Sequence, residues 1–313
     1  MKVLFIGNTR LGDAILSTPI LNFYNKKNNE ITVICSSLSK NIYSGFSCVK
    51  KVITLKKKKR GMHWLEAYTM LERKKWDLVI DLRNSLLSRL IRKRQIIRYN
   101  ESSDKIHKVE SYCKLIGLKK SISPFIPKNN TNQKIINNLI KKNNIKLPIL
   151  VIAPITNWKR KNWPLESYKK LIKKLLIKEK KYFSSVILLG SEDENINCEK
   201  LKKSLCNINV YNFAGLIKVL EIYELLKLCK LFIGNDSGLT HLAAASNIKT
   251  LALFGPSKNE IYRPWGKNSY FIRTPETYSQ LVEVKGYDRF DDASLLKNLK
   301  VNDVHRICLK ILS

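Results

Sequence analysis

Two doubly wound α/β domains, each built around a parallel β-sheet, are the fold that this sequence predicts. Short β-branched apolar runs alternate with longer stretches of helical periodicity along the whole chain. This rhythm occurs once before and once after the polar segment KKNNIKLP at 141–148. Strands alternating with helices over such lengths are typical of parallel sheets covered by helices. The chain of 313 residues is long enough for two domains, each with its own core.

The apolar runs give the order of the expected strands. In the first half these are Lys2–Ile6, Ile31–Cys35, Lys51–Leu55 and Asp77–Asp81. In the second half they are Ile149–Ala153, Ser185–Leu189, Asn209–Asn212, Leu231–Gly234 and Thr250–Phe254. Helices fall between them, including a Lys- and Asn-rich helix at Asn132–Lys142. Two Rossmann-like domains follow, at 1–145 and 146–313, with a ligand site where the carboxyl ends of the strands face a central cleft.

The composition narrows the choice of function. The formal net charge of +33 can follow simply from the Lys, Asn and Ile bias of an AT-rich genome. The alternative is that it helps to bind nucleic acid, anionic lipid or a phosphorylated substrate. Basic residues cluster at 56–60, 73–75 and 89–94. Since no apolar run approaches the ~18 residues of a membrane span and no signal peptide begins the chain, we expect a cytoplasmic protein. The seven cysteines and four histidines show no metal-ligand or disulfide spacing, so we expect free thiols and no bound metal.

The segment GNTRLGD, at 7–13, follows the first strand and has the layout of a phosphate-binding loop. Asp13 stands where such a loop has its lysine, and Thr9 stands where the dinucleotide-binding motif has its middle glycine. A carboxylate at this strand end can accept a proton from a substrate hydroxyl. The alternative is a first-turn acid stabilised by the helix dipole.

The stretch FIGNDSGLTHLAAASNIKTLALFGPS, at 232–257, predicts a strand, a tight turn, an alanine-rich helix and a second strand. The amides near Ser237 and Gly238, with the helix dipole, form an anion pocket that His241 can reach. The alternative is that Asp236 and Ser237 only cap the helix. The loop TNWKRKNWP, at 156–164, carries Thr156 and Lys161 at the end of another expected strand. Its hydroxyl and cationic groups are suited to binding a diphosphate, and the alternative is an ordinary solvated loop.

Taken together, these stretches resemble the heptosyltransferases of glycosyltransferase family 9, which build the inner core of lipopolysaccharide. The resemblance runs nearly end to end. It is carried by Gly12-Asp13, WDLVIDLRNSLLSRL at 76–90, HKVESY at 107–112, KNWP at 161–164, LLG at 188–190, NFAG at 212–215, NDSGLTHLAAASN at 235–247 and LFGPS at 253–257. The NSLLS stretch at 84–88, Leu239 and Ser257 are more similar to the type II enzymes, which add the second heptose. Asn157 and Lys249 depart from the family pattern.

The resemblance implies a GT-B fold and inverting, metal-independent transfer from a nucleotide-sugar, typically ADP-heptose, with no cofactor. It implies that the N-terminal domain binds the acceptor and that the C-terminal domain binds the donor. It also allows the last helix to pack back on the N-terminal domain. Asp13 matches the general base. The donor-binding positions are Thr156, Lys161, Asp236, Ser237, Gly238 and His241. The acceptor-binding positions are Gly12, Lys57, Lys58, Lys59, Arg60, Asn84, His107 and Glu110.

The partners implied by the resemblance are ADP-heptose, a lipid A-linked core oligosaccharide and the anionic cytoplasmic face of the inner membrane, where the protein would be peripheral. Another nucleotide-sugar donor and a relative that binds without turnover stay open. Nucleic acid is not expected as a partner, because the basic runs lack interleaved aromatic residues and no zinc-finger or RNA-recognition motif occurs.

Overall fold

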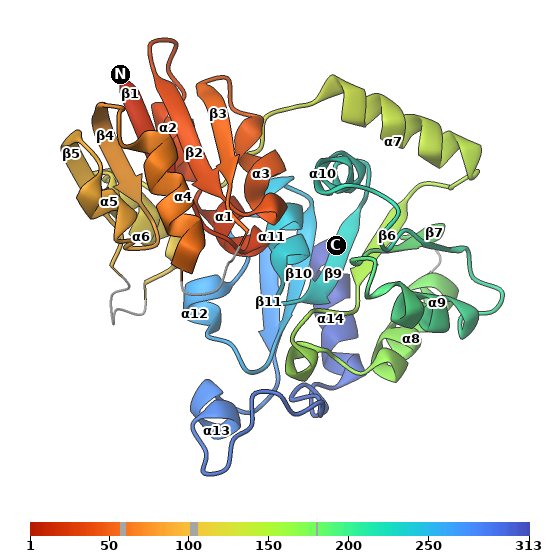
Figure 1. The fold of residues 1–313 in the computed structure, drawn as a ribbon. Helices are drawn as coiled ribbons and strands as arrows, with labels where there is room; N and C mark the ends of the chain where they lie inside the picture. Colours follow the sequence, from red (N-terminus) through yellow and green to blue (C-terminus); the bar gives the residue numbers. More distant parts are fainter. Residues whose placement is uncertain (57–60, 101–105, 180) are drawn as a thin grey trace. The chain divides into compact units, whose positions relative to one another are not determined.

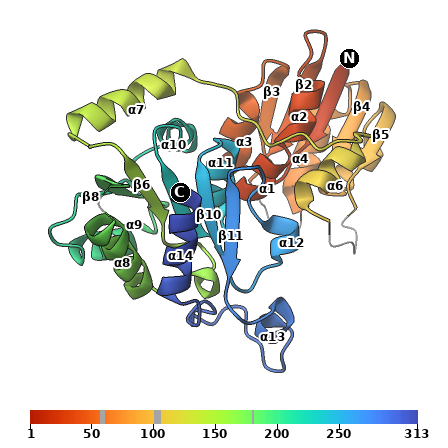
Figure 2. The same ribbon diagram turned by 180° about the vertical axis from the view of Figure 1, so that it is seen from behind.

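The structure, a computed structural model, describes residues 1–56, 61–100, 106–179 and 181–313. Its internal contacts divide the chain into two compact units, Met1–Lys128 and Asn129–Ser313. Over the described residues, the first unit holds a sheet of order β3-β2-β1-β4-β5 and the second a sheet of order β11-β10-β9-β6-β7-β8 (Figures 1 and 2). The paired strands of both sheets run parallel. The prediction of two parallel α/β domains is confirmed.

The expected strands all form, with ends within two residues of their predicted bounds. The first sheet contains β1 (Lys2–Ile6), β2 (Glu30–Cys35), β3 (Val49–Thr54), β4 (Trp76–Asp81) and β5 (Lys93–Arg98). The second contains β6 (Ile149–Ala153), β7 (Ser185–Leu188), β8 (Val210–Asn212), β9 (Leu231–Asn235), β10 (Lys249–Phe254) and β11 (Ser269–Arg273). Strands β5 and β11 were not predicted from the apolar pattern. Both are edge strands, and their half-exposed, charged or polar side chains hide the apolar pattern of a buried strand.

Helices cover the first sheet on both of its faces. They are α1 (Leu11–Leu16), α2 (Thr18–Tyr24), α3 (Ser37–Ser44), α4 (Met62–Leu71), α5 (Leu87–Leu90) and α6 (Lys108–Leu115). The core under α4 and α5 joins Leu4 and Ile6 of β1 to Ala67, Leu71 and Leu87. Since the alternate residues of β1 are buried as well, this central strand is apolar and buried from Val3 to Ile6, as parallel strands between two helical layers are.

Helices of the second unit are α7 (Asn130–Lys142), α8 (Leu165–Lys173), α9 (Asn195–Lys203), α10 (Val219–Leu226), α11 (Gly238–Ala245), α12 (Asn259–Tyr262), α13 (Tyr278–Val282) and α14 (Val301–Leu312). A 3₁₀ turn spans Lys159–Lys161, and a π-helical turn, Lys174–Lys178, extends α8. Because α7 packs against α10, the contacts divide the chain before α7, at Lys128, and not after it at 145. The apolar face of α14 lies in the core of the second unit, through Val304, Cys308 and Ile311.

All seven cysteines lie in the described ranges and are free thiols. In the part of the chain that the structure describes, no helix combines the length and the apolar character needed to cross a bilayer.

Candidate functional site

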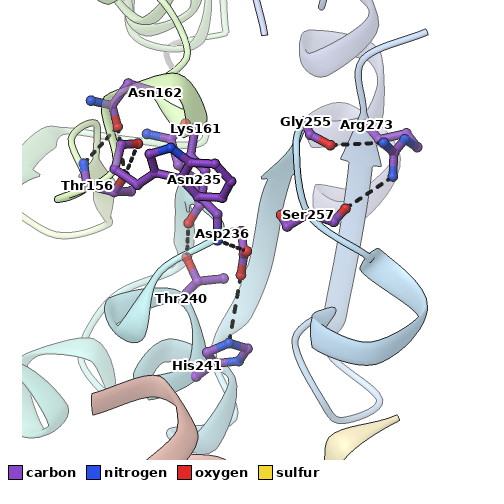
Figure 3. A network of polar contacts seen from close by, with 11 residues as sticks. Thr156, Lys161, Asn162, Asn235, Asp236, Thr240, His241, Gly255, Ser257 and Arg273 are labelled. Atoms are coloured by element: carbon purple, nitrogen blue, oxygen red, sulfur yellow. Dashed lines mark hydrogen bonds and ion pairs between the residues drawn. The ribbon is translucent and has the colours of Figure 1, made fainter. Parts of the chain in front are cut away.

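Polar side chains from distant parts of the second unit meet at the carboxyl edge of its sheet (Figure 3). The strands β6, β9 and β10 are neighbours there. The segments that follow these three strands carry Thr156 and Lys161, then Asp236, then Ser257. Parallel strands all end at the same edge, which explains why residues so far apart in sequence share one site.

An ion pair between Lys161 and Asp236 lies at the centre of this edge. The distance from Lys161 Nζ to Asp236 Oδ2 is 2.5 Å, and the side chains are 19% and 7% exposed. Burial alone would raise the pKa of Asp236. The charge of Lys161 and, next, that of His241 oppose this, with further help from hydrogen bonds, and the net pKa lies below its usual value. Asp236 is therefore ionised, and its carboxylate is held against a cation.

The motif helix α11 begins directly after this carboxylate. Its cap residue, Ser237, makes no side-chain hydrogen bond to the helix, and the Ser237 Oγ atom is buried with no partner among the described residues. His241, one turn further, places Nε2 3.9 Å from Asp236 Oδ1. The alternative that Asp236 and Ser237 serve only as helix caps is wrong, since one is paired with Lys161 and the other leaves the first amides of α11 uncapped.

Asn235, the first residue of the NDSGLTH motif, was not singled out from the sequence. It is fully buried. Its Oδ1 accepts hydrogen bonds from the Trp163 amide and the Tyr168 hydroxyl, both at 3.0 Å, and its Nδ2 donates to the Pro154 carbonyl at 2.8 Å. Asn235 thus ties the end of β9 to the loop that carries Lys161. A buried amide with several partners fixes a geometry that propensities do not reveal.

The loop between β6 and α8 is held by its own hydrogen bonds. Asn162 Oδ1 accepts from the Thr156 amide at 2.8 Å, and the Thr156 hydroxyl lies 3.0 Å from both Asn162 Oδ1 and the Trp158 carbonyl. The single hydroxyl proton of Thr156 is therefore shared within the loop, while its oxygen can still accept. Helix α8 follows this loop, with Pro164 as its N-cap.

A segment near the C-terminus, residues 286–295, holds this loop in place through several contacts, and we call it the strap. The Arg160 side chain donates to the Asp288 carbonyl, lies 3.4 Å from Asp291 Oδ2 and stacks over the Tyr287 ring. The Leu295 amide donates to the Arg160 carbonyl, and the Ser294 hydroxyl donates to the Asn162 carbonyl. Lys161 follows Arg160 directly, so this strap fixes the backbone that aims the site's cation. Nothing in the sequence of 286–295 marked it as part of the site.

Arg273, at the end of the unpredicted strand β11, braces the other side of the edge. Its guanidinium donates to the carbonyls of Gly255 and Ser257 (Figure 3). It also donates to Asn259 Oδ1 at 2.6 Å. These bonds shape the loop after β10, and the Ser257 hydroxyl of this loop lies close enough to Asp236 to help lower the pKa of its carboxyl group. Because β11 was not predicted from the sequence, Arg273 was not identified as part of the site.

In the first unit, Asp13 lies in the first turn of α1, half-buried, beside Gly12. The Asn8 side chain donates to the Asp13 carbonyl at 3.2 Å and to the Tyr112 hydroxyl at 2.9 Å. Burial and, second to it, the negative charge of Asp13 raise the pKa of Tyr112 well above its usual value. Asp13 therefore lies close to a buried, neutral phenol, and it also matches the first-turn acid that was the alternative interpretation.

Three of the predicted acceptor positions lie on other elements of the first unit. Asn84 adopts a left-handed conformation, with φ of 48°, in a turn held by hydrogen bonds to the buried Asp81 carboxylate. His107 is buried and caps α6, its Nδ1 accepting from the Val109 amide at 3.1 Å. Glu110 follows in the first turn of α6. The predicted positions Lys57, Lys58, Lys59 and Arg60 lie outside the described residues.

The chain is similar to known glycosyltransferases over most of its length. The model of glycosyltransferase family 9 (heptosyltransferase) matches residues 94–291. Lipooligosaccharide heptosyltransferase 2 of Campylobacter jejuni is 27% identical over an alignment of 290 positions that covers 85% of each chain.

Two solved structures share the fold over nearly their whole length. The ADP-heptose lipopolysaccharide heptosyltransferase II of E. coli has a TM-score of 0.75 at 20% identity, covering 100% of this chain and 98% of that one. The E. coli heptosyltransferase WaaC with ADP has a TM-score of 0.72 at 18% identity, covering 99% and 100%. The fold is thus GT-B, and the chain belongs to glycosyltransferase family 9, the heptosyltransferases.

Proposed function

We propose that this glycosyltransferase moves a heptose from ADP-heptose to the lipid A-linked core of lipopolysaccharide, with inversion and without an essential metal. The observation that carries the proposal is the Lys161–Asp236 pair beside the uncapped start of α11. It supplies a cation, a carboxylate and free amides at one strand edge. Both the Campylobacter relative and one solved neighbour carry names of type II enzymes, which supports addition of the second heptose.

Charge stabilisation at the departing diphosphate is the task we assign to Lys161 and α11. As the bond from the anomeric carbon to the ADP oxygen breaks, negative charge builds up on the diphosphate. The Lys161 ammonium and the first amides of α11, at Ser237 and Gly238, would receive it in the position that a metal takes elsewhere. Asp236 and His241 would accept and donate hydrogen bonds to the donor, and Thr156 Oγ1 keeps a lone pair for it.

Proton removal is the task we assign to Asp13. The acceptor hydroxyl oxygen attacks the anomeric carbon, and its proton passes to the Asp13 carboxylate. Gly12, Asn84, His107, Glu110 and the segment Lys57–Arg60 would contact the acidic acceptor. Because that acceptor is linked to lipid, the enzyme would work at the cytoplasmic face of the inner membrane.

The deciding experiment mixes the protein with ADP-heptose and a heptose-truncated core acceptor, then follows ADP release and the mass of the acceptor. We expect a mass gain of one heptose. A panel of other nucleotide-sugars run in parallel tests the donor. Transfer from a different sugar only would overturn the donor assignment, and no transfer from any donor to any core acceptor would overturn the proposal.

A further inference from the structure

We propose that α4 and α5 of the first unit form a docking surface for anionic phospholipid. The proposal rests on the proposed function in one respect, since a lipid-linked acceptor lies at a membrane. It goes further by assigning the contact to a defined surface. We call this the α4–α5 surface, and its exposed apolar members are Met62, Leu65, Met70, Leu86 and Leu90.

Large apolar side chains are unusually exposed on these two short helices and at Leu86, the N-cap of α5. Leu65, Leu86 and Leu90 are 57%, 66% and 58% exposed, and Met62 and Met70 are more than half exposed. The buried side chains of α4, His63, Ala67 and Leu71, recur along one face, so the helix is firmly seated and its outward face is a separate feature. Scattered single apolar residues on a surface are ordinary, whereas several on two packed helices mark an interaction site.

Aromatic and basic groups surround this apolar surface. Trp64 and Tyr68 of α4 are half-buried, and the Arg83 guanidinium carbon lies 4.6 Å from the centre of the Trp64 ring. The ends of α4 and α5 meet at a cleft of about 280 Å³ lined by Tyr68, Glu72, Arg73, Leu90 and Arg92. Amphipathic aromatics beside apolar side chains are the residues that proteins place at a lipid headgroup boundary.

The charge of the segment fits an anionic partner. Residues 61–94 contain eight Lys and Arg against four Asp and Glu, and one of the acids, Asp81, is buried and bonded to Ser85. Among the ion pairs of the described residues, none involves Arg73, Arg89 or Arg92. Glu66 and Glu72 lie on the same face, so the net attraction of this surface to anionic lipid is modest. Apolar insertion with basic residues at its rim favours anionic bilayers over zwitterionic ones.

The test uses the full-length protein and co-sedimentation with two kinds of vesicle, one of phosphatidylethanolamine with phosphatidylglycerol and one of phosphatidylcholine. We expect binding to the anionic vesicles that weakens with salt. The double variant Leu65→Glu/Leu86→Glu should bind about tenfold more weakly or worse. The pair Arg73→Ser/Arg92→Ser should lose about fivefold for each charge removed. The matched control, Ile177→Glu/Ile196→Glu, changes two exposed isoleucines of the second unit and should bind as the unmodified protein does.

Fluorescence supplies an independent readout from the surface itself. Brominated acyl chains should quench Trp64, and the Trp64→Phe variant should lose most of that quenching while still binding. Equal binding by the Leu65→Glu/Leu86→Glu variant, or no binding by the unmodified protein, would overturn the proposal. So would a protein dimer that the same substitutions abolish. Transfer to an acyl-free core acceptor should survive those substitutions, so failed docking and failed catalysis are told apart.

Discussion

The Lys161 ammonium and the Asp236 carboxylate meet at 2.5 Å, although one belongs to the loop after β6 and the other follows β9. Because each residue is largely buried, each needs the other's charge. The pair links the two parts of the chain that the proposed donor site requires, and it gives the site a measurable coupling.

A double-mutant cycle measures that coupling. Asp236→Asn leaves a partly buried ammonium without its counterion, and Lys161→Met leaves a buried carboxylate, so each should destabilise the protein by about 2 to 4 kcal/mol. The double variant should lose less than the sum, with an interaction of about 1 to 3 kcal/mol in urea unfolding. Additive losses would show that the two side chains do not interact in solution. Lys169→Met, at an exposed pair on α8, serves as the control and should change stability by less than 1 kcal/mol.

Low pH should reduce the free energy of unfolding of the second unit, because it protonates Asp236. Its folded pKa is depressed, so the unfolded chain binds a proton that the folded chain refuses. The stability that this residue supplies is therefore complete above the unfolded-state value of about 3.9 and is lost as the pH falls through the folded pKa. Unfolding free energies measured from pH 6 downward should decline less in Asp236→Asn than in the unmodified protein. Identical pH profiles would contradict the buried ion pair.

Removal of the Asp13 carboxylate should separate catalysis from donor binding. We expect Asp13→Ala and Asp13→Asn to lower kcat by about a hundredfold to ten-thousandfold, because the acceptor hydroxyl then has no base. The dissociation constant of ADP, measured by calorimetry, should stay within about twofold. If ADP affinity falls as far as the rate, Asp13 is a structural first-turn acid and the base lies elsewhere.

Arg160 should position Lys161 without touching substrate. Arg160→Met removes the bonds to Asp288 and Asp291, and we expect kcat/KM for the donor to fall about tenfold, the equivalent of one hydrogen bond to a charged group. Amide exchange at 156–162 should speed up, while global stability changes little. Lys159→Met is the matched neighbour: its pair with Asp292 is exposed, so it should leave both readouts unchanged. An equal effect of both variants would show that loop charge matters and the strap does not.

The sequence by itself determined the alternation of strands and helices. Buried parallel strands are continuous apolar runs, and amphipathic helices repeat their apolar residues with the helical period, so both can be recognised in the sequence. It also determined the local turn at 236–238, where a strand end and a helix start coincide. Its misses, β5 and β11, are edge strands whose side chains are half-exposed and include charged and polar residues, so they lack the continuous apolar run of a buried strand. The exact division at Lys128 was equally hidden, since it depends on which partner α7 packs against.

Only the tertiary structure decided which polar residues meet. Lys161 and Asp236 are 75 positions apart, and their contact exists because parallel pairing of β6 with β9 brings both strand ends to one edge. The supporting roles of Asn235, Arg273 and the strap at 286–295 follow from hydrogen bonds between segments that no local pattern connects. A motif can name the residues of a site, but the distances that give those residues their charge states arise from packing.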